Sequence, residues 1–403
     1  MEKVRVENLY KVFGQNPEKG VELLKQGKTK GEIMEETGMG VGVANASFYA
    51  NEGEIVVIMG LSGSGKSTLI RLINRLIDPT AGKVFVDGKD ITKLSIDELR
   101  QCRLDHLGMV FQNFALFPHR TVLQNTEFGL EVKRIDPEER TKAALKALEQ
   151  VGLKGWEDSY PDQLSGGMQQ RVGLARALAL DADIMLMDEA FSALDPLIRR
   201  DMQDELLALQ EEMQKTILFV SHDLDEALKL GDRIILMKDG VIVQQGTAEE
   251  ILTNPANDYV AKFVEDVDMS KVITAENVMV KPLELSYYET DGPKTAIHRM
   301  KKTGSDYLFV RKDKRLKGVV TIEDAVVANK KGEKDLHAFI REDHTVVTPD
   351  TPANKLFNVI NDKPYPIAVV NEKGQLVGVI TKTSLFTGLA DNMDWQTTQE
   401  GEE

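Results

Sequence analysis

The segment 60–67 carries residues whose types and spacing suit the binding of phosphate. It reads Gly-Leu-Ser-Gly-Ser-Gly-Lys-Ser and fits the pattern G-x-x-x-x-G-K-[ST] at every defined position. An apolar, strand-like run (54–59) precedes it, and an apolar segment that we expect to be helical (68–76) follows it, which is the context that this pattern requires. Backbone N–H groups of the loop and of the helix N-terminus would surround the phosphate oxygens. The residues expected to bind a nucleotide here are Gly60, Leu61, Ser62, Gly63, Ser64, Gly65, Lys66, Ser67 and Thr68.

Two adjacent carboxylates, Asp188 and Glu189, follow the buried-looking run 183–187. In P-loop enzymes an acid at this place organises Mg²⁺, the loop serine ligates the metal, and the loop lysine reaches the β- and γ-phosphates. Neighbouring side chains at a strand end point in different directions. Asp188 and Ser67 can therefore serve Mg²⁺ while Glu189 polarises a water molecule.

A second turn suited to an anion lies at 164–171, Leu-Ser-Gly-Gly-Met-Gln-Gln-Arg. Ser165 and the amides of Gly166 and Gly167 open another predicted helix there. One chain cannot bring both this turn and the loop 60–67 to a single phosphate. The pair makes sense if two copies of the chain enclose two ATP molecules between them.

Length and composition bound the remaining possibilities. The chain has 403 residues, enough for two or three domains. Its net charge of −15 argues against a nucleic-acid partner, because phosphate backbones attract basic surfaces. The single cysteine, Cys102, fits a reducing compartment, and an idle thiol is the ordinary interpretation. The N-terminus lacks the apolar core of a signal peptide, and no apolar run approaches the ~20 residues that span a bilayer.

The elements that must position these residues alternate in the manner of a parallel α/β domain over residues 1–265. The apolar runs 54–59, 183–188 and 216–222 read as buried parallel strands separated by helices. Residues 15–40 interrupt the alternation with two short predicted helices, at 18–26 and 29–36. Thr29 and Glu32 have the spacing of a capping box in the second of them. This insertion is either a surface decoration or an element that docks or senses.

A second domain is predicted from an internal repeat of 60 residues. The segment 315–321, Arg-Leu-Lys-Gly-Val-Val-Thr, recurs as Gln-Leu-Val-Gly-Val-Ile-Thr at 375–381, each time behind another apolar strand. Two halves of this size would bury a face against each other. We expect a linker at 266–275, repeats at 276–331 and 332–390, and a disordered acidic tail at 391–403.

The N-terminal 260 residues resemble the ABC (ATP-binding cassette) ATPases, because the motifs of that family occur here in its order. The family's signature motif is matched at 164–170, with Ser165, Gly166, Gly167 and Gln169 implied to bind ATP across a dimer. The resemblance assigns the lid-loop glutamine to Gln112, the dimer-contact loop to 192–195 with Asp195, and the switch histidine to His222. Phe13 matches the aromatic residue that stacks on adenine, although the insertion displaces the usual spacing and Tyr10 lies nearby.

The resemblance implies a mechanism as well as a fold. ATP binding would close a head-to-tail homodimer, and Glu189 would activate water for in-line attack. His222 would contact the γ-phosphate and Gln112 would sense Mg²⁺ and the water. Hydrolysis would then reopen the dimer. The cofactor expected beside ATP is Mg²⁺.

The whole chain resembles the ATPase subunits of bacterial glycine betaine/proline-type osmoprotectant importers, through the insertion, the run 188–199 and the C-terminal repeat. That repeat resembles a tandem pair of CBS domains, whose relatives bind adenine nucleotides or cyclic di-AMP. The expected fold is thus an α/β P-loop domain of the ABC type followed by an α+β CBS (Bateman) module. Two permease subunits and a substrate-binding protein or domain are the implied partners. The implied location is the cytoplasmic face of the cell membrane.

Two other functions compete with compatible-solute import. The same cassette could drive uptake of another small solute, such as an amino acid or a polyamine. A non-transport ABC ATPase acting on ribosomes or DNA usually has two cassettes or a long coiled-coil insertion, and the sequence contains neither. A permease docking cleft is implied at 113–119, Asn-Phe-Ala-Leu-Phe-Pro-His, although ordinary core packing accounts for some of its apolar residues.

The first repeat is strongly basic. Residues 292–334 contain twelve Lys and Arg against five Asp and Glu, densest at 311–317. A solvated face is one interpretation. Docking to an anionic partner, such as the inner leaflet of the membrane, is the other, and it predicts that salt regulates transport. The reason is that the screening length falls from about 30 Å at 0.01 M to about 8 Å at 0.15 M salt.

Overall fold

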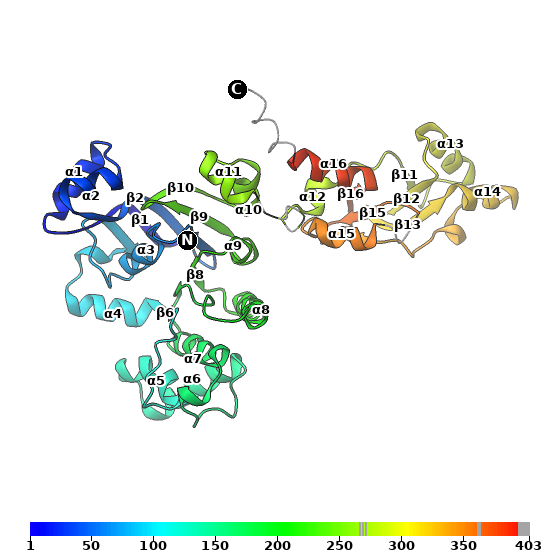
Figure 1. The fold of residues 1–403 in the computed structure, drawn as a ribbon. Coiled ribbons are helices and arrows are strands. Elements are labelled where there is room, and N and C mark those ends of the chain that lie inside the picture. Colours follow the sequence, from blue (N-terminus) through cyan, green and yellow to red (C-terminus); the bar gives the residue numbers. More distant parts are fainter. Residues whose placement is uncertain (266, 268–269, 271, 361–363, 394–403) are drawn as a thin grey trace. The chain divides into compact units, whose positions relative to one another are not determined.

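The computed structural model describes residues 1–265, 267, 270, 272–360 and 364–393. These fall into two compact units, Met1–Val264 and the part of the chain from Glu265 onward, each described here by itself (Figure 1). Residues 394–403, most of the expected acidic tail, lie outside the described part.

A six-stranded sheet of order β10-β9-β3-β8-β7-β6 forms the centre of unit 1. It is parallel except for the β9–β10 hairpin. Every residue of β3, β7 and β8 is buried, as expected for strands covered on both faces. The strands are β3 (Ile55–Met59), β6 (Leu107–Phe111), β7 (Ile184–Asp188), β8 (Thr216–Ser221), β9 (Arg233–Lys238) and β10 (Val241–Gly246).

An antiparallel sheet of order β2-β1-β4-β5 covers one side of this centre and contributes to the same hydrophobic core. It consists of β1 (Glu2–Phe13), β2 (Gly40–Asn51), β4 (Ala81–Val86) and β5 (Lys89–Asp90). Apolar residues alternate along β1, so that Val4, Val6 and Leu9 reach the core.

Helices complete unit 1, and three of them form a separate lobe. In that lobe α5, α6 and α7 pack on one another, away from α3 (Figure 1). The P-loop helix α3 covers 66–73 rather than the expected 68–76, because the glycine-rich loop leads directly into it. The helices are α3 (Lys66–Ile73), α4 (Ile96–His106), α5 (Val122–Val132), α6 (Pro137–Gln150), α7 (Gly166–Ala179), α8 (Pro196–Met213), α9 (Leu224–Leu230), α10 (Ala248–Thr253) and α11 (Asp258–Val264), with 3₁₀ turns η1 (Ile91–Lys93) and η2 (Pro161–Gln163).

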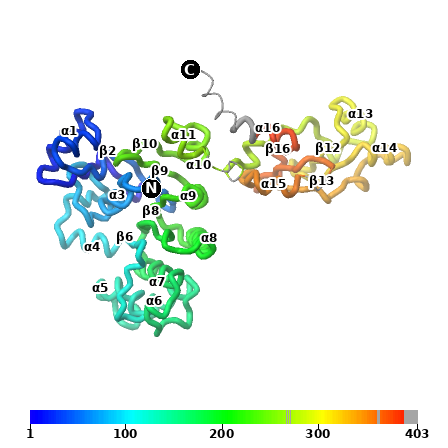
Figure 2. Tube along the Cα trace, in the orientation of Figure 1, coloured from blue at the N-terminus to red at the C-terminus, as the bar shows by residue number. Residues whose placement is uncertain are grey.

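The insertion between β1 and β2 forms two helices, α1 (Pro17–Lys25) and α2 (Lys30–Thr37), next to β1 and β2 (Figure 2). The predicted capping box is present: the Thr29 side chain accepts from the Glu32 amide, and the Glu32 carboxylate accepts from the Thr29 amide. The insertion has its own small core, in which Val21, Ile33 and Met39 pack with residues of the two strands.

Unit 2 contains two three-stranded sheets of the same design. In each, the first strand pairs parallel with the second and the second antiparallel with the third. The first repeat comprises β11 (Leu285–Tyr287), α13 (Pro293–Thr303), β12 (Tyr307–Lys312), β13 (Arg315–Thr321) and α14 (Ile322–Lys330). The second comprises β14 (Val346–Val347), α15 (Ala353–Val359), β15 (Ile367–Val370), β16 (Leu376–Ile380) and α16 (Lys382–Met393), after the 3₁₀ turn η4 (His337–Phe339).

The two repeats share a hydrophobic core, and the helix that precedes the first repeat packs on the second. Phe309 and Val319 of the first pack with Ala368 and Val379 of the second. The first helix, α12 (Ala275–Val278), begins inside the expected linker and packs against α15, β16 and α16, all of the second repeat.

Candidate nucleotide-binding site

The P-loop turns sharply at glycines that no other residue could replace without a clash. Gly60 follows β3 with a φ of 145°, and a Cβ there would lie 2.2 Å from the Met237 carbonyl oxygen. Gly65 has a φ of 102°, and its Cβ would lie 2.3 Å from the Gly42 carbonyl oxygen. The loop is therefore pressed between β2 and the β9–β10 turn and leads into the amide-rich start of α3.

Lys66 occupies the buried interior of this loop. Its Nζ donates to the carbonyl oxygens of Gly60 at 2.8 Å and Leu61 at 3.1 Å. Burial lowers the pKa of Lys66, and the negative charges of Glu189 and Asp188 oppose that shift. A cation held beside free helix amides, with two carboxylates nearby, suits a triphosphate with a divalent metal.

Asp188 ends β7, and its side chain is almost fully buried. Its Oδ2 accepts from Arg71 at 3.2 Å, and its Oδ1 has no hydrogen-bond partner in the described part of the chain. A buried, unpaired carboxylate oxygen needs a ligand, and oxygen ligands are those that Mg²⁺ prefers. The described residues contain no group of three or more His, Cys, Asp or Glu side chains that could hold a metal by themselves. Asp188 and the hydroxyl of Ser67 thus fit a magnesium ion that takes its other ligands from phosphate and water.

Three polar side chains meet at the carboxyl edge of the central sheet. Because β6, β7 and β8 are adjacent and parallel, the residues that follow them share one edge. Gln112 follows β6, and its Nε2 donates to Glu189 Oε2 at 3.1 Å. His222 follows β8, with its Nδ1 3.6 Å from the same oxygen. Glu189 itself has a φ of +49°, an uncommon backbone conformation that is typical of functional sites.

The segment 192–195, which the resemblance assigns to the dimer-contact loop, also contacts this group. Gln112 Nε2 also donates to Ser192 Oγ at 3.2 Å. Asp195 caps α8, and its Oδ1 accepts from the amides of Leu197 at 3.2 Å and Ile198 at 3.1 Å. Its side chain is therefore occupied by its own helix in this structure.

The signature turn stands apart from the P-loop, in the helical lobe (Figure 1). Ser165 is the N-cap of α7, and its Oγ accepts from the Met168 amide at 3.3 Å. Gly166 and Gly167 begin that helix at the surface. Gln169 turns inward, donating to the Pro161 carbonyl at 2.9 Å. Within one chain, Ser165 at the start of α7 and the P-loop before α3 thus lie in different parts of unit 1.

Phe13 and Tyr10 differ in their availability for stacking. Tyr10 is only 7% exposed and belongs to the core of the insertion. Phe13 is 45% exposed and lies against Gly42, beside Thr68 of the P-loop helix. Of the two rings, Phe13 is thus the one that is exposed beside the P-loop helix.

Sequence reasoning missed several residues that hold these groups in place. Arg199 of α8 donates to the carbonyls of Ser192 at 3.3 Å and Leu194 at 3.2 Å, and to Asp223, next to His222, at 3.4 Å. Arg71, which donates to Asp188, is another such residue. Neither residue type nor spacing marks such partners, because they contact positions far away in the sequence.

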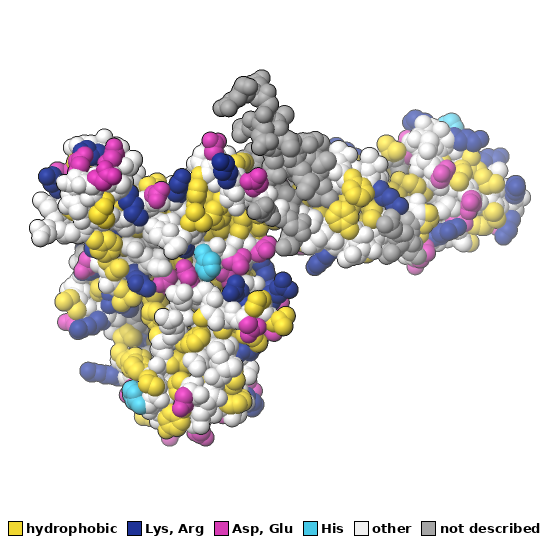
Figure 3. Space-filling view, viewed as in Figure 1, with side chains coloured by type: hydrophobic (Ala, Val, Ile, Leu, Met, Phe, Trp, Pro, Cys, Tyr) yellow, Lys and Arg dark blue, Asp and Glu magenta, His cyan; other side chains and the backbone are white. Residues whose placement is uncertain are grey.

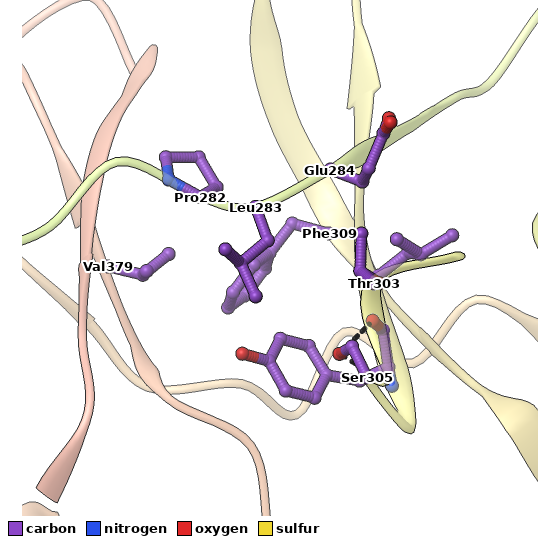
Figure 4. A pocket seen from close by; sticks show the side chains of 9 residues that line it. Pro282, Leu283, Glu284, Thr303, Ser305, Phe309 and Val379 are labelled. Carbon is purple, nitrogen blue, oxygen red and sulfur yellow. Dashed lines mark hydrogen bonds between the residues drawn. The ribbon is translucent and has the colours of Figure 1, made fainter. Parts of the chain in front are cut away.

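A narrow cleft lies between the repeats of unit 2. Val379 of the second repeat faces Pro282 and Leu283 of the first, with Phe309 and the Thr303–Ser305 turn behind them (Figure 4). Its volume is about 10 Å³, roughly that of one water position. This cleft is too small for a nucleotide in the conformation described.

The sheet order, the P-loop ahead of α3 and the signature turn in a separate helical lobe together define the ATPase domain of the ABC class. The family model of the ABC transporter matches residues 43–192, and that of the CBS domain matches residues 334–391, the second repeat. The first repeat has the same order of elements.

Relatives match nearly the whole chain. It is 54% identical over 396 residues to the glycine betaine transport ATP-binding protein OpuAA of Bacillus subtilis, which covers 98% of this chain and 94% of that protein. It is 52% identical over 393 residues to the glycine betaine/carnitine transport ATP-binding protein GbuA of Listeria monocytogenes, covering 97% and 98%. A solved dimer of the ATP-binding cassette MJ0796 with ADP and phosphate has a TM-score of 0.52 and 36% identity, and covers 60% of this chain and 98% of that chain.

The chain belongs to the ABC transporter family and, within it, to the group of ATP-binding subunits that includes OpuAA and GbuA. It is an ATPase whose hydrolysis of ATP is coupled to transport. Subunits of this class work as dimers with permease partners in the membrane. No helix among the residues described here has the length and apolar character needed to cross a bilayer.

Proposed function

We propose that the chain drives uptake of glycine betaine or a closely related compatible solute through a separate permease. The observation that carries this proposal is the match of over half of all residues, across both units, to proteins named for glycine betaine transport. ATP hydrolysis by this subunit would provide the energy for transport, and the permease and its substrate-binding protein or domain would select the solute. The chain would therefore lie against the cytoplasmic face of the membrane.

Reconstitution with the cognate permease in vesicles tests this function. ATP hydrolysis should rise when glycine betaine, proline betaine or carnitine is supplied with the binding protein. A response to an amino acid or a polyamine, with none to betaines, would favour the alternative importer. The Glu189→Gln variant in the same vesicles controls for hydrolysis by contaminating ATPases.

For the chemical step, we infer that two chains close head to tail over two ATP molecules. The P-loop residues and Phe13 of one chain would bind phosphates and adenine, and the signature residues of the other would complete the site. Glu189 would orient and activate the attacking water, with Gln112 and His222 aligned on it. Mg²⁺, held by Ser67, Asp188 and Gln112, would neutralise charge on the phosphates when bound. Positioning and charge stabilisation account for most of the rate in such a site.

We further propose that the CBS module regulates transport through ionic strength, through an adenine nucleotide such as cyclic di-AMP, or through both. Basic side chains gather over α13 and α14 (Figure 3), the region of the basic run. Some charges in that run already have partners: Lys317 donates to Glu342 at 2.6 Å, and Lys312 lies 4.6 Å over the Tyr288 ring. Lys314, in the turn between β12 and β13, is exposed.

Salt titration of reconstituted transport separates the two signals. Neutralising Arg311, Lys312, Lys314, Arg315 and Lys317 together should flatten the salt dependence in vesicles with anionic lipid. Neutralising five basic residues of unit 1 controls for total charge. An unchanged curve in the first variant would reject the membrane contact. Calorimetry of the full chain with cyclic di-AMP, AMP and ATP, in the Lys66→Ala background, reports binding at the CBS module alone.

A further inference from the structure

The insertion at 15–40 is built as a rigid lobe and is fixed to the strand that leads to Phe13. A Cβ at Gly20 of α1 would lie 2.7 Å from Val12 of β1, which shows how closely the helix approaches the strand. Ile33 of α2 is fully buried in the lobe's core. Both helices are capped, by Asn16 and by the box at Thr29. The lobe therefore has a defined position on β1 and β2.

The two strands that hold the lobe also border the nucleotide site. β1 ends at Phe13 just before the insertion, and β2 brings Gly42 against Phe13, Thr68 and Gly65 just after it. The insertion thus leaves and re-enters the fold at the rim of the P-loop. A displacement of the lobe would therefore shift the P-loop directly, through the ends of β1 and β2.

Lys30 makes this connection direct. It is the first residue of α2, and its Nζ donates to the carbonyl oxygen of Gly63 at 3.2 Å. Gly63 is the middle glycine of the P-loop, and a Cβ there would meet nothing within 4 Å. We call the part of the loop around Gly63 its outer arm. Space is free where a side chain of residue 63 would lie, and the carbonyl oxygen of Gly63 accepts the hydrogen bond from the Lys30 ammonium group. The lobe's ion pair between Lys28 and Glu36 and the capping box at Thr29 keep the start of α2 in place.

An ammonium group at this carbonyl has two effects on the loop. It restrains the Gly63 peptide, whose glycine would otherwise sample many conformations. It also places a positive charge next to the proposed phosphate site, in addition to the charge of Lys66. Hydrogen bonds to a charged donor are stronger than neutral ones. The same peptide is held at its other end, because the Ser64 amide donates to the Leu61 carbonyl oxygen at 3.1 Å.

We propose that Lys30 makes the insertion part of the nucleotide-binding site: it is a positioning residue that holds the outer arm of the P-loop and increases the affinity for the phosphates of ATP. The proposal rests on the proposed phosphate-binding role of the P-loop. It gives the insertion a function other than decoration. It also places a second lysine, far from Lys66 in the sequence, under the same loop.

Titration of the full chain with ATP tests the proposal. Lys30→Ala should raise the Kd for ATP about three- to tenfold, the loss expected for one partly exposed charge-assisted bond. In the reconstituted transporter, KM for ATP should rise while kcat at saturating ATP stays unchanged. Lys30→Arg should recover most of the affinity, and Lys19→Ala, on the same lobe, should match the wild type.

The salt dependence and a reference variant make the test decisive. The effect of Lys30→Gln should shrink as KCl rises, because the ammonium charge is screened in the wild type. Wild-type affinity in Lys30→Ala and Lys30→Gln, or a fall in kcat with KM unchanged, would overturn the proposal. Lys66→Ala should abolish binding in the same assay. If Lys66→Ala binds ATP normally, the assignment of the P-loop fails instead. Thermal denaturation of each variant identifies any change that is caused by loss of folding.

Discussion

At the scale of single residues, the site is a set of side chains whose charges are arranged before the nucleotide arrives. Gln112 and His222 already converge on one oxygen of Glu189. Asp188 carries one oxygen paired with Arg71 and one that is buried and unpaired. These contacts orient the acid groups, so little rearrangement remains for the chemical step.

Glu189→Gln should keep ATP binding and lose turnover. The amide has nearly the shape of the carboxylate and can still contact Gln112, but it cannot accept a proton from water. We expect kcat to fall by at least about 100-fold, the usual contribution of a general base. The variant should form a stable dimer in MgATP, measured by size-exclusion chromatography with light scattering. Undiminished hydrolysis would show that another group activates the water.

A buried acid, Glu226, accepts a hydrogen bond from Ser221, the residue before His222, and it predicts a pH effect on stability. Burial raises the pKa of Glu226, while hydrogen bonds from Ser221 and Gln203 oppose the shift. The folded state therefore holds this proton more tightly than the unfolded state, whose pKa is near 4.5, so stability falls as pH rises above that value. In Glu226→Gln the fall should be smaller, measured by thermal denaturation from pH 4.5 to 7. The exposed Glu212→Gln serves as control, and an identical pH slope in both variants would exclude Glu226 as the cause.

At the scale of elements, the carboxyl edge of the sheet brings distant residues together, and buried polar side chains fix the loops. The lid loop contains two consecutive non-glycine residues with positive φ, Phe114 and Ala115. Arg176 of α7 donates to both of their carbonyl oxygens, at 3.1 and 2.6 Å. The signature helix is thereby bonded to the loop that carries Gln112. A shift of one would move the other.

Asn125 is the second support of that loop, and its loss should be costly. It is fully buried, accepts from the Phe117 amide at 2.8 Å, and donates to the carbonyls of Phe117, Arg120 and Thr121. Asn125→Ala leaves these groups unpaired, and we expect a loss of about 2–4 kcal/mol in the free energy of unfolding. Urea denaturation measures it, with the exposed Asn113→Ala as control. A loss below about 1 kcal/mol would show that water replaces the amide.

Much of this arrangement follows from the sequence, for identifiable reasons. Gly60–Ser67 and Asp188 were predicted because glycine geometry and strand ends restrict where phosphate and metal can bind. The capping box at Thr29 was predicted from local spacing alone and is confirmed. The contacts of Arg199, Arg176 and Lys30 were not predicted, because each depends on a tertiary approach between segments that no local pattern encodes. The start of α3 at Lys66 was missed because the loop's own backbone forms the first turn.

At the scale of the whole molecule, the separation of Ser165 from the P-loop fits the proposed head-to-tail dimer. In that dimer each chain would present half of two sites, so hydrolysis would depend on a second copy. Since the ATP-bound interface would form along these turns, nucleotide binding and dimer formation can be measured separately.

A bulky group at the signature turn should separate those two events. Ser165→Trp, in the Glu189→Gln background, should retain ATP binding by each chain yet form no MgATP-dependent dimer, because the indole would obstruct the partner's phosphates. Calorimetry measures the binding and light scattering the dimer. Glu139→Trp, on the exposed face of α6, should still assemble. A Ser165→Trp chain that assembles normally would contradict a composite site.

The packing of α12, at the start of unit 2, against the second repeat has a consequence for how unit 2 folds. A Cβ at Gly378 would lie 2.5 Å from the Met279 sulfur, and one at Gly388 would lie 2.7 Å from Val278, so the start of the module is packed tightly into its end. A chain cut after the first repeat would leave α12 without the surface that buries it. We therefore expect that neither repeat folds stably by itself. The two should unfold in one cooperative transition, and a mutation in the last helix should destabilise the segment through which the module is attached to the ATPase.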